Sequence, residues 1–449
     1  MRNLTMKKLF SISSVLLMFV ARSYGQAVPT ASATTTPGGF TTQALVPWAD
    51  GTVHYALSAT EMVRFGYYGS GTTSSTAFSG NVGYATLSET HPFSLLYVGG
   101  VLIGQGGPGT TTYHNIMASQ ALVKGKWVMQ VADSFSFLPQ SPVAGVSGIS
   151  GVGLVGTYPV DGPADGPAGG VLTYSGNRIG NTLDGSIERL LTARTSITGS
   201  GSWRVLHFLD NNAGLDTGGA TGQVGINHSI NMRNTVSLSA VYSTYTTTGL
   251  LANLTGAGTD SVTYQTKGLN ATYERLWTRS LSSEISAGPQ WVQSSSAQLI
   301  PNKLNAYVNA RATYVRQVGT FGVRYTRGVN NGSGAFAGAM ADSVSGSFSR
   351  SITRDWNVSA WAAYTHTTGL LYANTSTQGG VANGAINTVY GTLQLSHRFT
   401  RTISGYANYS AQNQDVSSSL ASRNVFTGLS HTIGFGVSWT PRSKRLGDF

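Results

Sequence analysis

The stretch HTIGFGVSWTP, residues 431–441, decides the fold class. Large apolar and small or polar side chains alternate along it, and the large ones are Ile433, Phe435, Val437 and Trp439. Because a β-strand points successive side chains to opposite faces, this alternation predicts a strand with one apolar face and one small, polar face. Such a strand needs an apolar environment on one side and tolerates water on the other.

The same two-faced alternation recurs upstream, over residues 388–399, 281–291 and 321–326. The segments are longer than the five or six residues usual in soluble sheets, and they suit a tilted strand that crosses a bilayer. Charged residues make up only 10% of the chain, whereas soluble domains average about 25%. No long apolar run is present, which excludes a helical membrane protein. A large all-β protein is therefore predicted.

Two classes of connection alternate between these segments. Short, mostly basic turns follow every second segment, and longer connections rich in Gly, Asn and Thr follow the others. Short turns at one end and long loops at the other are typical of transmembrane β-barrels with an even number of strands. Eight short turns and nine long loops predict an antiparallel up-and-down barrel of 18 strands. The first segment, 53–66, has the weakest pattern, so 16 strands is the next choice.

A Thr-Arg pair lies in several of the short turns. QLSHRFTRTISGYANYS (394–410) carries it at Thr400-Arg401, and the same pair occurs at Thr353-Arg354 and Thr278-Arg279. The arginines could reach anionic lipid headgroups or snorkel from the base of the barrel, or they could be ordinary solvated turn charges. Both readings stay open for Arg194, Arg233, Arg279, Arg316, Arg354, Arg398 and Arg401.

The N-terminus has the features of a secretory signal. Arg2, Lys7 and Lys8 precede an apolar stretch at 9–21, and small residues follow before Gln26. We therefore predict a signal peptide at 1–25, a flexible Thr/Ser/Pro-rich lead-in at 26–51, the barrel at 52–441 and a basic tail at 442–449. The chain has no cysteine, and a protein of this size needs no disulfide to bury a stable core.

These features together resemble a bacterial outer-membrane β-barrel of porin-like size. The resemblance covers residues 52–441 and rests on the alternating segments, the two classes of connection and the aromatic final strand. It implies the outer membrane as location, outer-membrane lipids and the barrel assembly machinery as partners, and a possible homo-oligomer. Many such barrels end in an aromatic residue, and Phe449 fits that pattern. The last recognisable strand, however, ends at Trp439, and a basic tail lies between the two residues.

Sequence motifs for chemistry are weak. GVGLVG (151–156) matches a dinucleotide-binding pattern, but prolines follow where that site requires a helix. The eight histidines show no metal-ligand spacing, and no G-x-S-x-G motif is present. We predict no enzyme activity, no cofactor and no metal. Only the isoelectric point, near 9.7, suggests nucleic-acid binding. The predicted export from the cytoplasm argues against it, so no nucleic-acid partner is expected.

Aromatic residues cluster near the short turns and the C-terminal end of the last strand. Aromatic rings favour the headgroup level of a membrane, where one edge is apolar and the other is wet. The alternative is the general preference of aromatic residues for strands. The predicted aromatic girdle consists of Phe93, Trp127, Trp277, Phe321, Trp356, Phe399 and Trp439.

Four charged residues share a face with small polar ones and are candidates for the pore lining: Arg204, Arg311, Arg324 and Glu284. They could equally be interior salt-bridge partners without a role in selectivity. Asp133 is different, because the alternation places it on the apolar face with Trp127 and Val131. A bulge could turn it inward, the register could be wrong, or it could meet another protomer.

The longest connection, residues 139–171, carries apolar residues between glycines and prolines. Because apolar side chains gain from covering a surface, we expect this loop to fold inward and narrow the pore, through Val143, Val146, Ile149, Val152, Leu154 and Tyr158. Packing as a lid or as a protomer contact is the alternative. The function expected is passive diffusion of small hydrophilic solutes. Export of a surface polymer such as an exopolysaccharide, and a structural or adhesive role of the loops, are the other candidates.

Overall fold

The computed structural model describes residues 51–66, 71–86, 88, 90–105, 110–138, 177–209, 215–248, 261–295, 300–332, 336, 338–370, 384–417, 426–442 and 444–445. The predicted signal peptide, residues 26–50 of the lead-in and the loop 139–171 lie outside them. Within the part described, no helix is long and apolar enough to cross a membrane.

Long antiparallel strands make up almost all of the described chain. They are β1 (Thr52–Phe65), β2 (Thr72–Ala85), β3 (Phe93–Gln105), β4 (Thr110–Lys124), β5 (Trp127–Leu138), β6 (Arg178–Leu190), β7 (Thr195–Phe208), β8 (Asp216–Asn231), β9 (Asn234–Thr248), β10 (Ser261–Leu276), β11 (Leu281–Ser294), β12 (Lys303–Arg316), β13 (Gly319–Asn330), β14 (Ala339–Ser351), β15 (Trp356–Gly369), β16 (Ala385–Arg398), β17 (Ile403–Val416), β18 (Gly428–Trp439) and the two-residue β19 (Lys444–Arg445).

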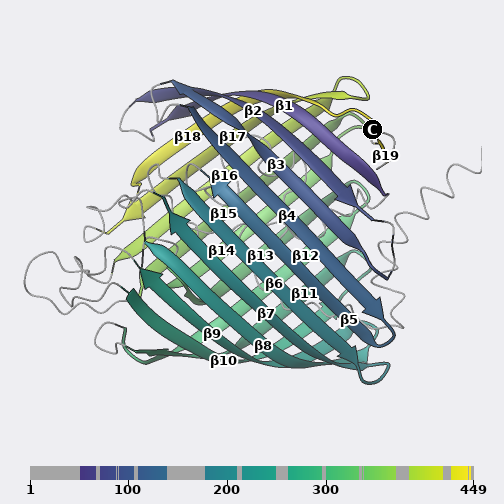
Figure 1. Cartoon of the computed structure of the whole chain (residues 1–449), viewed down its shortest axis with the longest axis vertical. Helices are drawn as coiled ribbons and strands as arrows, with labels where there is room; N and C mark the ends of the chain where they lie inside the picture. The colour runs from purple at the N-terminus through teal and green to yellow at the C-terminus, as the bar shows by residue number, and fades with distance from the viewer. Residues whose placement is uncertain are drawn as a thin grey trace, which may run out of the picture.

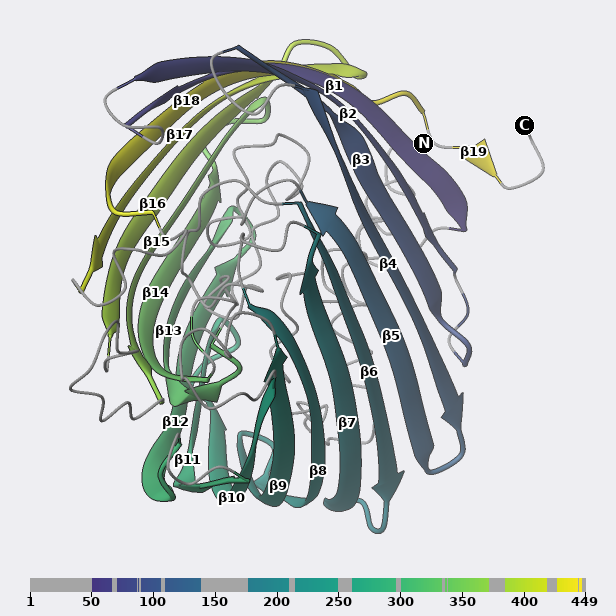
Figure 2. The same cartoon turned by 60° about the vertical axis from the view of Figure 1, so that its left-hand side comes forward.

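Each strand from β1 to β18 pairs with its neighbours in sequence, and the first strand closes the ring on the last. β1 pairs with β2 and also with β18, in a register that runs from Leu57 opposite Trp439 to Phe65 opposite His431. Figure 1 shows the strands crossing the wall at a slant, and Figure 2 shows the closed ring with β1 beside β18 and β9 beside β10 opposite them. The prediction of 18 strands in an antiparallel up-and-down barrel is confirmed. Closure removes the open edges that a sheet otherwise exposes.

The basic tail adds a short extension to this ring. Lys444 and Arg445 form β19, which pairs with Val53 and Thr52 at the start of β1. Part of the predicted tail thus continues the pairing of β18 along the same edge of β1.

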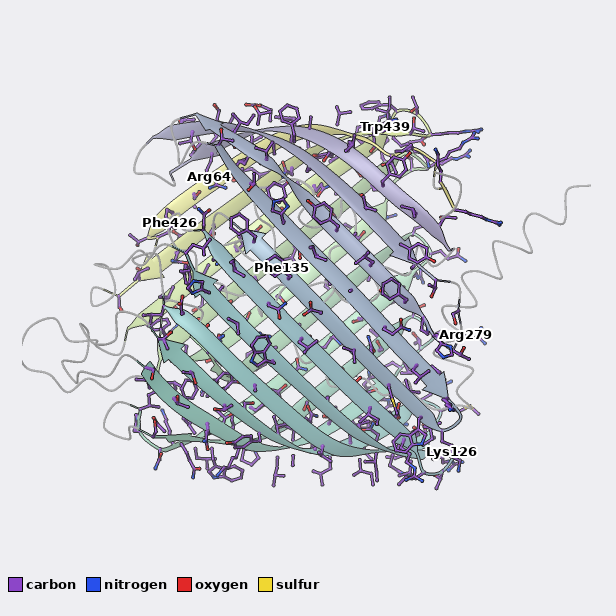
Figure 3. All side chains as sticks on the ribbon, in the orientation of Figure 1. Arg64, Lys126, Phe135, Arg279, Phe426 and Trp439 are labelled. Atoms are coloured by element: carbon purple, nitrogen blue, oxygen red, sulfur yellow. The ribbon has the colours of Figure 1, made fainter. Side chains whose placement is uncertain are left out.

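The connections sort to the two ends of the barrel. The short turns occupy 86–92, 125–126, 191–194, 232–233, 277–280, 317–318, 352–355 and 399–402 at one end, which we call the turn end. The other connections lie at the opposite end, the loop end, and most are longer, although 66–71, 106–109 and 209–215 are no longer than the turn 86–92. Figure 3 places Lys126, Arg279 and Trp439 toward the turn end and Arg64 and Phe426 toward the loop end.

The threonine of the Thr-Arg pair is the residue that fixes the turn. In the β10–β11 turn, the hydroxyl oxygen of Thr278 accepts hydrogen bonds from the backbone N–H groups of Ser280 (3.1 Å) and Leu281 (3.0 Å). The carbonyl oxygen of Leu281 accepts from the N–H groups of Trp277 and Thr278 and closes the hairpin. Serine and threonine hydroxyls commonly stabilise tight turns in this way.

Three other turns repeat this arrangement, at Thr192, Thr353 and Thr400. The β8–β9 turn uses the side-chain oxygen of Asn231 in the same position. An exposed arginine comes directly after Thr353 and Thr400, and two positions after Thr192 and Asn231. Each turn therefore combines a side chain that fixes the backbone with an exposed positive charge.

Candidate functional site

The outer face of the barrel is apolar around its whole circumference. Large hydrophobic side chains on alternate positions are exposed, for example Val224 (63%), Leu304 (59%) and Phe435 (63%), and Phe135 lies on the outside of the wall in Figure 3. Soluble monomers rarely expose apolar patches of more than a few hundred Å². A continuous apolar band around a closed barrel is covered by lipid.

The inner face is polar, as the sequence pattern predicts. On β14–β18 most of the described inward residues are small or amide side chains, and they include Ser343, Ser345, Thr365, Thr388, Gln412, Gln414, Ser430 and Thr432. Four larger buried side chains also face inward among them: Trp361, Ile386, Tyr390 and Tyr406. Several of the small and amide side chains bond to each other across strands. The Thr365 hydroxyl donates to the Ser343 hydroxyl (3.1 Å), and the Thr388 hydroxyl donates to the side-chain amide oxygen of Gln414 (3.2 Å). The only charged side chain on this part of the described inner face is Arg398, at the turn end.

The chain is a porin-like outer-membrane β-barrel. An apolar exterior, a polar interior, an even number of closed strands and turns that are short at one end distinguish this class from soluble β-sheet proteins. The inner wall is the surface that a passing solute would contact.

Three of the four predicted pore-lining residues lie in one row. Glu284, Arg311 and Arg324 occupy directly opposite positions on β11, β12 and β13, and Glu274 on β10 extends the row. A guanidinium N–H of Arg311 donates to the Glu284 carboxylate at 2.9 Å, and Arg324 donates to the Asn309 side chain at 3.2 Å. The row forms a local dipole on one side of the barrel, and its part in selectivity stays a prediction.

The fourth predicted residue, Arg204, lies apart from this row. It faces inward from β7, opposite Thr182 of β6. Its charge interacts with Asp184, which faces inward from β6. Opposite charges thus occur on the inner face at two separate places, β6–β7 and β10–β13.

The loop end of β8–β13 is filled by an apolar cluster that the sequence did not reveal. Val262, Tyr264 and Val292 face inward from β10 and β11 with at most 2% of their surface exposed, and Leu215 and Ile300 from the adjoining connections pack against them. The ring of Tyr264 stacks on Tyr245 with 5.0 Å between ring centroids. In this corner, which we call the filled corner, buried apolar side chains gather, whereas most inward positions of β14–β18 carry small polar groups.

The β13–β14 connection reaches into this corner. We call its described residues, Asn331, Gly332, Phe336 and Gly338, the inward segment. The Asn331 side-chain amide donates to the Thr217 hydroxyl on β8 at 3.2 Å, although four strands, β9 to β12, lie between β8 and β13 in the wall. The Tyr264 hydroxyl donates to the backbone carbonyl of Asn330. The inward segment therefore bridges two parts of the wall across the loop end.

Two glycines make this path possible. Gly338 has φ +104°, and a Cβ there would lie 2.8 Å from the ring of Tyr264. Gly332 has φ +77°, and a Cβ would lie 2.1 Å from the carbonyl oxygen of Phe336. Positive φ and such close approach both require glycine. Phe336 itself is buried against Ala339 and Ile386.

The predicted constriction loop, 139–171, lies outside the described residues, so its inward folding stays a prediction. The predicted girdle residues are exposed or half-buried on the outer face near the turn end. Trp277 (49%), Phe321 (50%) and Phe399 (62%) are examples, and a headgroup-level role for them stays a prediction.

Asp133 faces outward, and the strand around it is regular. β5 pairs without interruption with both β4 and β6, so neither a bulge nor a register error explains it. The Asn181 side-chain amide on β6 donates to its carboxylate at 3.1 Å. A polar neighbour on the same outer face thus offsets part of the cost of this carboxylate. Contact with another protomer stays open.

Within the described ranges, no group of three or more His, Asp or Glu side chains is placed to hold a metal ion. No family model and no curated protein matches the sequence.

Solved structures of Pseudomonas aeruginosa proteins have a similar overall layout. OccK2 (OpdF) is 10% identical over 89% of this chain and 99% of its own, with a TM-score of 0.41. OpdQ is 11% identical over 88% and 98%, and the outer membrane protein OpdK is 9% identical over 88% and 100%, both with a TM-score of 0.40. At these values the similarity does not extend to a solute or to a site residue.

Proposed function

We propose that this barrel is a passive diffusion channel for small hydrophilic solutes and performs no chemistry on them. The observation that carries the proposal is the contrast between the two faces of the same strands, apolar outside and hydroxyl-rich inside. Polar side chains on the inner face hold water, and barrels of 16–18 strands are wide enough to leave an aqueous channel.

The inner face also favours neutral or weakly charged solutes over highly charged ones. Along β14–β18 the wall offers hydrogen-bonding groups of Ser, Thr and Gln without a fixed charge until Arg398. The charges of the row on β10–β13 include both signs, two acids and two bases. Such a pore exerts only a small net field on a passing ion, so weak ion selectivity is expected.

The turn end faces the periplasm in this proposal, because outer-membrane barrels have short turns on that side. The chain has no cysteine, so single cysteines report topology directly. Gly256→Cys, in the connection between β9 and β10, should react with an impermeant maleimide on intact cells. Arg354→Cys, in the β14–β15 turn, should react only after the outer membrane is opened. Equal labelling of both on intact cells would contradict this orientation.

Liposome swelling tests the function. Liposomes that contain the purified barrel should swell in isotonic solutions of small neutral sugars, at rates that fall steeply as the sugar becomes larger. Heat-denatured protein is the control. A correctly folded barrel that admits no small sugar would contradict a diffusion channel, and polymer export or a structural role would then be the better reading.

A further inference from the structure

Five cations lie on the outer face at the turn end, apart from those in the turns. Strands β4, β6, β10, β12 and β14 all run toward this end, and each has an exposed basic residue at or near its last outward position. These residues are Lys124, Arg189, Arg275, Arg316 and Arg350. In the four arginine cases an exposed apolar residue follows two positions later, on the same face. These residues are Leu191, Trp277, Val318 and Ile352.

Three of the arginines stack on outward-facing aromatic rings. The guanidinium carbon lies 4.0 Å from the ring centroid of Trp277 for Arg275, and 5.1 Å from that of Trp127 for Arg189. Arg316 lies 5.7 Å from the ring of Tyr314. Stacking uses the flat face of the guanidinium and leaves its N–H edge available. The charge is thereby held against the wall, at the level of the aromatic rings.

No outward-facing acid of the described strands lies at the turn end. The outward acids of the described strands, Glu61, Asp133, Asp216, Asp342 and Asp415, lie from the middle of the strands to the loop end. Two of them have basic partners: Asp342 pairs with Arg327 at 3.0 Å, and Asp216 with His207 at 2.6 Å. In the described turns the one acid is Asp355, which pairs with Arg398 at 2.8 Å.

We propose that this turn-end rim is a binding surface for anionic phospholipids of the membrane leaflet that it meets. The five strand-end cations would pair with the headgroup phosphates, while the acyl chains lie along the apolar wall above them. A phosphodiester accepts two N–H bonds from the edge of a guanidinium, and the stacked aromatic ring supplies the amphipathic surface that headgroups contact. The exposed turn arginines add attraction over a Debye length.

Tryptophan quenching by phospholipids with brominated chains tests this surface. A single-tryptophan variant that keeps Trp277 reports on the rim beside Arg275. A second variant that keeps Trp203 is the matched control, because Trp203 is outward and 50% exposed but its cross-strand neighbours are Leu183 and Ala220. Brominated phosphatidylglycerol and phosphatidylcholine are compared in mixed bilayers at low salt.

The anionic lipid should be preferred about five-fold at Trp277, the effect of one basic residue near a membrane surface, and should not be preferred at Trp203. Arg275→Gln should reduce the preference to the Trp203 value, and Arg275→Lys should retain part of it. Added inorganic phosphate should not compete, which distinguishes a lipid site from a simple phosphate site. Equal preference at both tryptophans, or a preference that survives Arg275→Gln, would overturn the proposal.

A second measurement does not depend on replacing tryptophans. Native mass spectrometry of the otherwise unaltered barrel should show fewer bound phosphatidylglycerol molecules when Arg189, Arg275, Arg316 and Arg350 are all changed to Gln. Heat-modifiable migration on gels confirms that the variant is folded. If the folded variant retains the same number of anionic lipids, the rim cations do not bind them.

Discussion

Two parts of the inner wall share the alternating strand pattern but differ in the side chains that face inward. Along β14–β18 most inward positions carry Ser, Thr and Gln, several of which bond to each other across strands, and the larger inward side chains Trp361, Tyr390 and Tyr406 lie among them. Along β8–β13 the inward positions carry a buried apolar cluster at the loop end and a row of paired charges below it. The same alternation forms the wall in both places. Because the inward residues of β14–β18 are mostly polar and those at the loop end of β8–β13 are apolar, we expect the first part to line a passage and the second to support the inward segment.

The largest effect is expected at the centre of the filled corner. Tyr264→Ala removes a fully buried ring, its hydroxyl bond to Asn330 and its stack on Tyr245. The barrel should lose about 3–5 kcal/mol of unfolding free energy, as other buried aromatic residues do. Single-channel conductance should rise because the inward segment loses its anchor. Urea unfolding in liposomes and planar-bilayer recording measure the two quantities.

Tyr242→Ala on β9 is the control for this variant, because Tyr242 faces lipid and is 44% exposed. Tyr242→Ala should lower the unfolding free energy by less than Tyr264→Ala does, and it should leave the single-channel conductance unchanged. Equal effects of the two substitutions would show that the filled corner has no special part in holding the inward segment.

Breaking the ion pair in the charged row should have the next largest effect. In the unaltered barrel the Arg311 guanidinium lies 2.9 Å from the Glu284 carboxylate. Glu284→Gln leaves this guanidinium beside a neutral amide instead. A loss of about 2 kcal/mol is expected, below the value for a fully buried pair because Arg311 is partly exposed. The reversal potential in a salt gradient should shift toward anions. Asp355→Asn breaks the exposed pair with Arg398; it should cost less than about 1 kcal/mol and shift the reversal potential less than Glu284→Gln does, because solvent screens this pair at the turn end.

Deletion of residues 143–168, with the ends joined by a short Gly-Ser linker, distinguishes the effect of the predicted constriction loop on conductance from the effect of the filled corner. Stability should change little, because the strands on either side keep their pairing with β4 and β7. Conductance should rise severalfold if this loop narrows the pore. Unchanged conductance in a folded barrel would leave a lid or a protomer contact as the role of the loop.

The smallest effect is expected from one new charge on the hydroxyl-rich wall. Ser410 faces inward on β17 between Thr392 and Thr432. Ser410→Asp should shift the reversal potential toward cations, because the described inner face of β16–β18 carries no acid that could mask the change. Ser410→Asn, similar in size and neutral, should not shift it. A shift of equal size in both variants would point to steric narrowing.

The fold could be predicted from the sequence because alternation and turn chemistry are local. Segments such as 431–441 specify two faces by themselves, and each Thr-Arg pair marks a turn wherever the strands run. The face of Glu284, Arg311 and Arg324 was predictable for the same reason. Their arrangement in one row was not, since it depends on the register between neighbouring strands.

The inward segment could not be predicted, because its contacts are with distant strands. The stretch VNNGSGAFAG (329–338) has the composition of an exposed loop. Its only strong signal was Phe336, a single large apolar residue among glycines and alanines. Asp133 is the reverse case: its outward position followed from the alternation, whereas its Asn181 partner lies 48 residues away on β6.

Planar-bilayer recording of the purified, refolded barrel tests the central claim most directly. A water-filled channel through an 18-strand barrel should give discrete, ohmic conductance steps that grow in proportion to salt concentration and show weak ion selectivity. Heat-denatured protein should give none. A barrel that is folded by heat-modifiable migration and yet inserts without any conductance step would contradict the account.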